Sequence, residues 1–137
     1  MATINMQTMR FINLLDRISR VKTRRCFIYN NVIVFAVPGY LMSRAIGPNG
    51  KNVRIIQEQL GRRVKIVREP QGIEDASQFI RDVVEPLSFR SLEIQDSEMI
   101  IAAGSRYKAA LLGRDKIRWH ELSRITEDFF QKSVRII

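Results

Sequence analysis

The octapeptide IGPNGKNV, residues 46–53, largely decides which fold this sequence predicts. Two glycines bracket a Pro-Asn pair, and Lys51 follows the second glycine directly. Apolar residues recur at helical spacing before it, in YLMSRAI (40–46), and after it, in KNVRIIQEQL (51–60). The octapeptide therefore joins two predicted helices, and Gly61 is well placed to end the second one.

The spacing of the glycines argues against two common nucleotide-binding loops. A P-loop requires G-x-x-x-x-G-K-[ST], but Ala45 stands at the first glycine position and Asn52 at the hydroxyl position. A P-loop also follows a strand, whereas this loop follows a predicted helix. The dinucleotide-binding fingerprint G-x-G-x-x-G does not occur in the sequence. The pattern therefore disfavours an NTPase or a dinucleotide-dependent enzyme.

A G-x-x-G loop between two helices suits a sugar-phosphate backbone. Glycine has no Cβ, so a nucleic-acid strand can approach the peptide chain closely. The free N–H groups at the start of the second helix attract phosphate, and Lys51 adds a positive charge. Ile46 and Val53 offer apolar surface for bases. The candidate RNA-binding residues are Ile46, Gly47, Pro48, Asn49, Gly50, Lys51, Asn52, Val53 and Arg54.

The distribution of charge also favours a polyanionic partner. The 137 residues carry a formal net charge of +9. Residues 1–70 contain 13 Lys/Arg and 3 Asp/Glu (+10), whereas residues 71–137 contain 10 and 11 (−1). The alternative is a basic surface with no specific partner, but the charge gathers in the half that holds the glycine loop. A solvated strand face or a phosphate-tracking stripe is predicted at Arg62, Arg63, Lys65 and Arg68.

The predicted elements occur twice in one order: helix, strand, strand, helix, helix, strand. Gly47 and Gly113 lie 66 residues apart, which indicates an internal repeat with a junction at REPQGIED (68–75). The Asn30-Asn31 pair is predicted to form a hairpin turn, because asparagine tolerates positive φ. The first six elements are 5–19, 26–29, 32–37, 40–46, 51–60 and 62–69, and the second six are 74–87, 90–95, 98–103, 106–113, 117–130 and 133–137.

The second half departs from the glycine pattern. Aligned on Gly113 it contains GRDK, which places Lys116 at the position of the second glycine and Asp115 where phosphate would lie. A side chain at position 116 is expected to hinder a nucleic-acid backbone. The segment from Gly113 to Val134 is also four residues longer than its counterpart, about one helical turn. Weaker RNA contact is predicted for Gly113, Arg114, Lys116 and Arg118.

The octapeptide resembles the signature of the KH domain, whose GXXG loop clamps about four nucleotides. The element order resembles the type II form, and SRAIGPNGKNVRIIQEQLGRRVKIVRE (43–69) is similar to the KH region of the NusA transcription factors. Two consecutive units resemble the short archaeal NusA-like proteins. The resemblance implies an α+β fold of two tandem type II KH domains, residues 1–70 and 71–137. Each would be a three-stranded sheet covered by helices on one face.

The same resemblance implies a function in transcription elongation, termination or antitermination. The expected partners are single-stranded RNA, as the nascent transcript, and RNA polymerase. Two alternatives stay open: a KH protein of ribosome assembly or RNA decay, and a protein-interaction adaptor whose KH fold no longer binds RNA. The degenerate second loop favours the adaptor, and the intact first loop opposes it.

The remaining residues predict no catalytic or metal site. His120 is expected at the surface or in packing, and Cys26, Trp119, Phe129 and Phe130 in the core or an interface. No Ser/His/Asp set and no metal-like cluster can be assembled, so we expect no enzyme, cofactor or small-molecule substrate. No apolar run approaches the roughly 20 residues that cross a bilayer. The N-terminal stretch lacks a signal-peptide pattern. A cytoplasmic protein without a membrane partner is the expectation.

Overall fold

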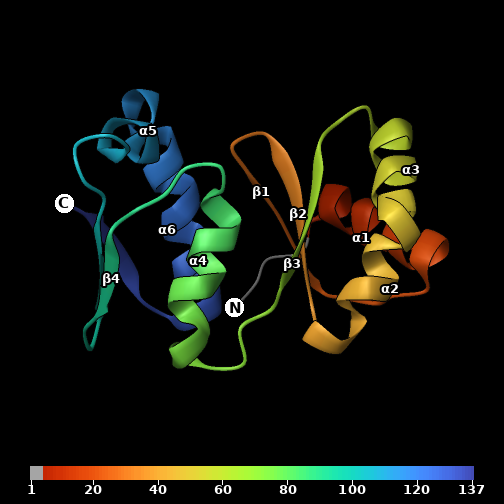
Figure 1. The fold of residues 1–137 in the computed structure, drawn as a ribbon, viewed down its shortest axis with the longest axis horizontal. Helices are drawn as coiled ribbons and strands as arrows, with labels where there is room; N and C mark the ends of the chain where they lie inside the picture. The colour runs from red at the N-terminus through yellow and green to blue at the C-terminus, as the bar shows by residue number, and fades with distance from the viewer. Residues whose placement is uncertain (1–4) are drawn as a thin grey trace. The chain divides into compact units, whose positions relative to one another are not determined.

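The computed structural model describes residues 5–137. Residues 1–4, which belong to the predicted first domain and to the stretch compared with signal peptides, lie outside the described residues. The described chain divides into two compact units, residues 5–69 and 70–137. Each unit has its own three-stranded sheet, with its helices on one side of that sheet (Figure 1). Within residues 5–137, no helix is long and apolar enough to cross a membrane.

The first unit follows the predicted element order. It consists of α1 (Met6–Ser19), β1 (Arg25–Tyr29), β2 (Val32–Val37), α2 (Met42–Ile46), α3 (Lys51–Leu60) and β3 (Val64–Arg68). Strand β2 lies in the middle, antiparallel to β1 and parallel to β3. Asn30 and Asn31 have φ values of 51° and 65°, so the hairpin turn predicted from this pair is confirmed.

Apolar residues spaced along α1 build the core of the first unit. Asn5 caps the helix, with its side chain accepting a hydrogen bond from the Thr8 N–H at 2.8 Å. Phe11, Leu14 and Leu15 are then buried on one side of the helix. They share a core with alternate residues of β2 and with one small or branched residue from each of the short helices: Ile33, Phe35, Val37, Ala45 and Ile56. This core fixes α2 and α3, and therefore the loop between them.

The second unit repeats the topology of the first. It consists of α4 (Ala76–Val84), β4 (Ser91–Ile94), β5 (Glu98–Ala102), α5 (Lys108–Leu112), α6 (Ile117–Phe130) and β6 (Ser133–Ile136). Strand β5 lies between antiparallel β4 and parallel β6. Helix α6 has 14 residues and α3 has 10, so the extra helical turn predicted from the sequence is confirmed.

The fourth helix is shorter than predicted. The sequence favoured a helix over 74–87, but α4 ends at Val84 and Leu87 lies outside it. Glu85 adopts an extended backbone (ψ 136°), because the residue before a proline avoids the helical region. At the other end, Asp75 does not cap the helix with its side chain. Its carboxylate instead accepts a hydrogen bond from the Gln71 N–H at 2.9 Å.

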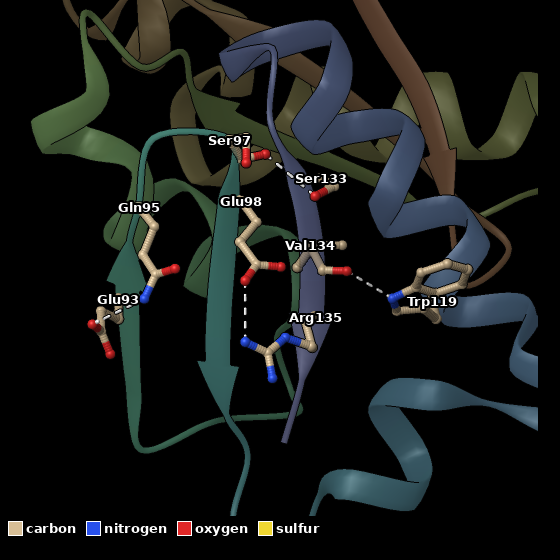
Figure 2. Close-up of polar contacts among 8 residues, drawn as sticks. All are labelled: Glu93, Gln95, Ser97, Glu98, Trp119, Ser133, Val134 and Arg135. Carbon is tan, nitrogen blue, oxygen red and sulfur yellow. Dashed lines mark hydrogen bonds and ion pairs between the residues drawn. The ribbon is translucent and has the colours of Figure 1, made fainter.

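Side chains tie β6 to the rest of the second unit (Figure 2). The Trp119 Nε1–H donates to the Val134 carbonyl at 3.0 Å, which anchors α6 on β6. Arg135 pairs with Glu98 of β5 at 3.1 Å. Farther along α6, the Phe129 ring lies 4.6 Å from the Phe79 ring, measured between centroids. The aromatic residues of α6 therefore have the packing role that the sequence favoured.

Candidate nucleic-acid interface

Residues 47–50, the clamp loop, form a single tight turn between α2 and α3. Gly47 has φ 79° and ψ 165°, a backbone region that is essentially restricted to glycine. Asn49 (φ 54°) and Gly50 (φ 73°) are both left-handed. The Gly50 N–H donates to the Gly47 carbonyl at 3.1 Å and closes the turn. The backbone therefore needs glycine most strongly at position 47.

The two glycines of the clamp loop differ in their surroundings. A Cβ on Gly47 would lie 2.8 Å from Asn52 Cγ and 3.0 Å from the Asn52 backbone nitrogen. A Cβ on Gly50 would approach nothing closer than Arg54 Nη1, at 3.6 Å. The fold thus has room for a side chain at position 50 and none at position 47. Glycine at position 50 leaves the face of the loop uncovered, which suits the close approach of a ligand.

Two candidate RNA-binding side chains hold the clamp loop in place. The Asn52 Nδ2–H donates to the Arg44 carbonyl at 2.9 Å, one of the last carbonyls of α2. The Arg54 guanidinium donates to the Asn49 carbonyl. The first bond joins α3 to α2 across the loop, and the second ties the loop itself to α3. Asn52 and Arg54 therefore have a positioning role that the sequence did not indicate, because spacing alone does not show where a carbonyl points.

The surface around the clamp loop is basic and polar at the rim and apolar within. Pro48, Asn49 and Lys51 are exposed, and Ile46 and Val53 are half-buried. Among the described side chains, none caps the N-terminus of α3, so its first N–H groups face the loop without a side-chain acceptor. The structure thus brings the nine residues predicted from 46–54 together around one helix start. A strand of phosphates could lie against this helix start.

Sequence reasoning missed Arg44. This exposed arginine lies in the last turn of α2, and its carbonyl anchors Asn52. The signal was available, because a residue three positions before Gly47 lies next to the loop on a helix.

The second loop, residues 113–116, keeps the backbone of the clamp loop without its second glycine. Gly113 has φ 77° and ψ 170°, and Asp115 and Lys116 have φ values of 55° and 61°. A Cβ on Gly113 would lie 2.9 Å from the Arg118 backbone nitrogen, so this glycine is required as Gly47 is. Lys116 shows that the turn itself tolerates a side chain at the second glycine position.

The supports of the second loop differ from those of the clamp loop. Arg118 occupies the place of Asn52, and its guanidinium pairs with Glu121 at 3.2 Å. His120 occupies the place of Arg54, with its ring centroid 5.0 Å from that of Trp119. Arg114 and Lys116 are exposed, as is the acidic Asp115 between them. Four predicted contact residues thus lie around this loop, with a carboxylate at its tip.

The clamp loop lies within a segment that matches a known protein family. Residues 32–82, from β2 through the clamp loop into α4, match the family model of the KH domain. KH domains grip single-stranded nucleic acid with a GXXG loop.

A particular relative extends the likeness to nearly the whole chain. The sequence is 24% identical over 131 residues to a Halococcus morrhuae protein described as "Probable transcription termination protein NusA". That alignment covers 93% of this chain and 92% of the relative. A solved structure described as "Crystal structure of APE1850" superposes with a TM-score of 0.67 at 20% identity. It covers 98% of this chain and 100% of that one, which shows a shared fold.

Proposed function

We propose that this chain is a tandem type II KH protein that binds single-stranded RNA without catalysis. Its two KH domains would be residues 1–70 and 71–137. The GPNG clamp loop would grip the RNA backbone, and the half-buried Ile46 and Val53 would face the bases. The observation that carries the proposal is Gly50: the turn has space for a side chain there, and the matching position of the second loop holds Lys116 at a similar φ, but glycine leaves the face of the clamp loop uncovered. The KH match over residues 32–82 supports the same site.

We further propose a NusA-like role in transcription elongation, termination or antitermination, in an archaeal cytoplasm. The nascent transcript would be the RNA, and RNA polymerase the protein partner. The supporting observation is the Halococcus relative, which matches along almost the full length of both chains. A KH protein of ribosome assembly or RNA decay is the alternative within the same class. Stable binding to a polymerase complex that carries a nascent transcript would favour the transcription role over this alternative.

A protein-interaction adaptor is the second candidate for the function. The second loop favours it, because Asp115 places a negative charge at the tip where a phosphate would lie. On the main proposal, the second unit extends or braces the first and contributes weaker RNA contact.

The test compares matched charge changes in the two loops. Pro48→Asp with Asn49→Asp converts the clamp loop to GDDG, and Arg114→Asp converts the second loop to GDDK. Affinity for a ten-nucleotide single-stranded RNA is measured across a salt series, with circular dichroism to confirm folding. Wild-type affinity should fall with salt, the GDDG variant should lose most binding, and the GDDK variant should lose less. A folded GDDG variant with unchanged affinity would refute the clamp loop as the RNA site.

A further inference from the structure

Tyr40 is an aromatic residue that the fold leaves in solvent. The residue is 85% exposed, the highest value among the exposed large apolar and aromatic residues within residues 5–137. It lies in a single 3₁₀ turn (Gly39–Leu41), directly before α2. The Leu41 N–H donates to the Pro38 carbonyl at 2.9 Å and holds that turn. The backbone under Tyr40 is thus fixed, while its ring contributes little burial to the core.

Two arginines lie beside this turn. A Cβ on Gly39 would lie 2.7 Å from Arg68 Nε, so the Arg68 side chain packs directly over the backbone that precedes Tyr40. Arg44 follows Tyr40 by four residues, about one helical turn, and is also exposed. Surfaces that bind single-stranded nucleic acid commonly combine exposed aromatic rings with nearby cations.

The Tyr40 turn is continuous with the clamp loop. The end of the 3₁₀ turn and then α2 lead from Tyr40 to Gly47, seven residues and roughly 10 Å at 1.5 Å per residue. The connection is anchored, because the Arg44 carbonyl accepts the hydrogen bond of Asn52. Tyr40 therefore lies at a fixed distance from the residues that would hold the phosphates.

The second unit differs at the matching positions. Sixty-six residues on, Arg106 replaces Tyr40 and Tyr107 replaces Leu41. The Arg106 guanidinium lies over the Tyr107 ring, 5.1 Å from its centroid. In the second unit, one face of the aromatic ring is therefore covered by the protein's own cation.

We propose that Tyr40 stacks against a base of the RNA strand that the clamp loop holds, so that the site extends beyond the four nucleotides of a GXXG grip. Arg44 and Arg68 contact the phosphates on either side of that base. Stacking on a tyrosine ring tolerates any base, so Tyr40 adds affinity and length to the site rather than sequence preference. The inference rests on the proposed function, because it requires RNA in the clamp loop.

The test uses two substitutions at position 40 and two RNA lengths. Tyr40→Phe keeps the ring, and Tyr40→Ala removes it. For a ten-nucleotide RNA, Tyr40→Ala should weaken binding roughly tenfold, whereas Tyr40→Phe should stay within about twofold of wild type. For a four-nucleotide RNA, all three proteins should bind alike. In parallel, photo-crosslinking with a 5-iodouracil-substituted ten-nucleotide RNA should attach RNA to Tyr40, as read by mass spectrometry.

The outcomes separate this inference from the proposed function. Unchanged binding of the ten-nucleotide RNA by Tyr40→Ala, with no crosslink at position 40, would overturn the stacking role and leave the clamp loop in place. Equal losses for Tyr40→Ala and Tyr40→Phe would also overturn it, because the ring would then not be the contact. If the GDDG variant keeps wild-type RNA affinity, the proposed function fails first.

Discussion

Gly50 and Gly61 both have a left-handed backbone, with φ values of 73° and 63°. Gly50 lies in the clamp loop, before α3, whereas Gly61 follows the last residue of that helix. Gly61 ends α3, and a Cβ there would meet no atom within 4 Å. Replacing either glycine by alanine should cost a similar amount, about 1 kcal/mol of unfolding free energy, from the left-handed backbone. Only Gly50→Ala should weaken RNA binding, because only that Cβ would lie on the face of the clamp loop.

Urea denaturation measures the unfolding free energy of each variant, and titration with a ten-nucleotide RNA measures its RNA affinity. Gly61→Ala is the matched control, with the same strain outside the clamp loop. Comparable RNA affinities for the two variants would contradict the role assigned to the second glycine.

Gly47→Ala tests the structural requirement at the first glycine. Its ψ of 165° lies outside the left-handed region of ordinary residues, and a Cβ would meet the Asn52 backbone nitrogen at 3.0 Å. The substitution should lower the unfolding free energy by about 1–3 kcal/mol, more than Gly50→Ala does. Gly113→Ala should act alike in the second unit, because its ψ is 170°. Equal midpoints for Gly47→Ala and Gly50→Ala in urea would show that the two positions carry the same constraint.

Cys26 provides a prediction about pH. Burial raises the pKa of its thiol from the ordinary 9.0 to about 12. The folded protein therefore keeps the thiol proton at pH values where the unfolded chain releases it. Stability from this group is fully present below pH 9 and is lost as the pH rises toward 12. At a pH of about 8.5, iodoacetamide should label the native thiol far more slowly than the urea-unfolded one, as read by mass spectrometry.

A matched variant isolates the contribution of Cys26. The decrease in stability between about pH 8 and pH 10, measured in urea, should be smaller in Cys26→Ala than in wild type. An identical pH dependence in both proteins would assign the decrease to other groups.

At the scale of elements, the sequence of the clamp loop can be grafted onto the second loop, because both loops join two helices. The second loop already has the backbone of the clamp loop, so what it lacks are the residues at its tip. Arg114→Pro, Asp115→Asn and Lys116→Gly together recreate GPNG there. In a chain whose clamp loop is disabled as GDDG, this graft should restore part of the RNA affinity. Two obstacles are removed, the negative charge at the tip and the side chain at position 116.

The graft has its own control. Lys116→Gly alone relieves the left-handed lysine and should keep or raise stability, but it leaves Asp115 in place. It should therefore restore less binding than the triple substitution. A triple variant that is folded and still does not bind RNA would show that the supports around the loop matter more than its tip. Those supports differ, since Arg118 pairs with Glu121, whereas Asn52 at the matching position donates to the Arg44 carbonyl of α2.

The sequence predicted those features that depend on neighbouring residues better than those that depend on contacts between distant parts of the chain. The hairpin turn follows from the Asn30-Asn31 pair, and the length of α6 from counting residues between Gly113 and Val134. The predicted end of α4 was wrong, although the local signal of Pro86 was present and the apolar spacing simply outweighed it. The hydrogen bonds from Asn52 to the Arg44 carbonyl of α2 and from Arg54 to the Asn49 carbonyl of the loop were not predictable, because they depend on the three-dimensional path of the backbone.

At the scale of the whole molecule, the charge is divided between the two units. The first 70 residues carry +10 and the remainder −1. If RNA lies on the clamp loop, affinity should depend on where a positive charge is removed and not only on how many are removed. For a single-stranded RNA, removing one cation that neutralises a phosphate should reduce the slope of log affinity against log salt by about 0.7.

Two double variants with the same net charge test this division. Arg44→Gln with Lys51→Gln removes exposed cations beside the clamp loop, and Lys108→Gln with Arg124→Gln removes exposed cations from the second unit. The first pair should flatten the salt slope by about 1.4 and weaken binding at low salt, if both side chains contact phosphate. The second pair should leave slope and affinity near wild type, because neither Lys108 nor Arg124 belongs to the predicted RNA contacts of either loop. Equal changes in the salt slope for the two pairs would mean that RNA affinity depends on the summed charge of the molecule. That result would contradict the proposal that the clamp loop positions the RNA strand.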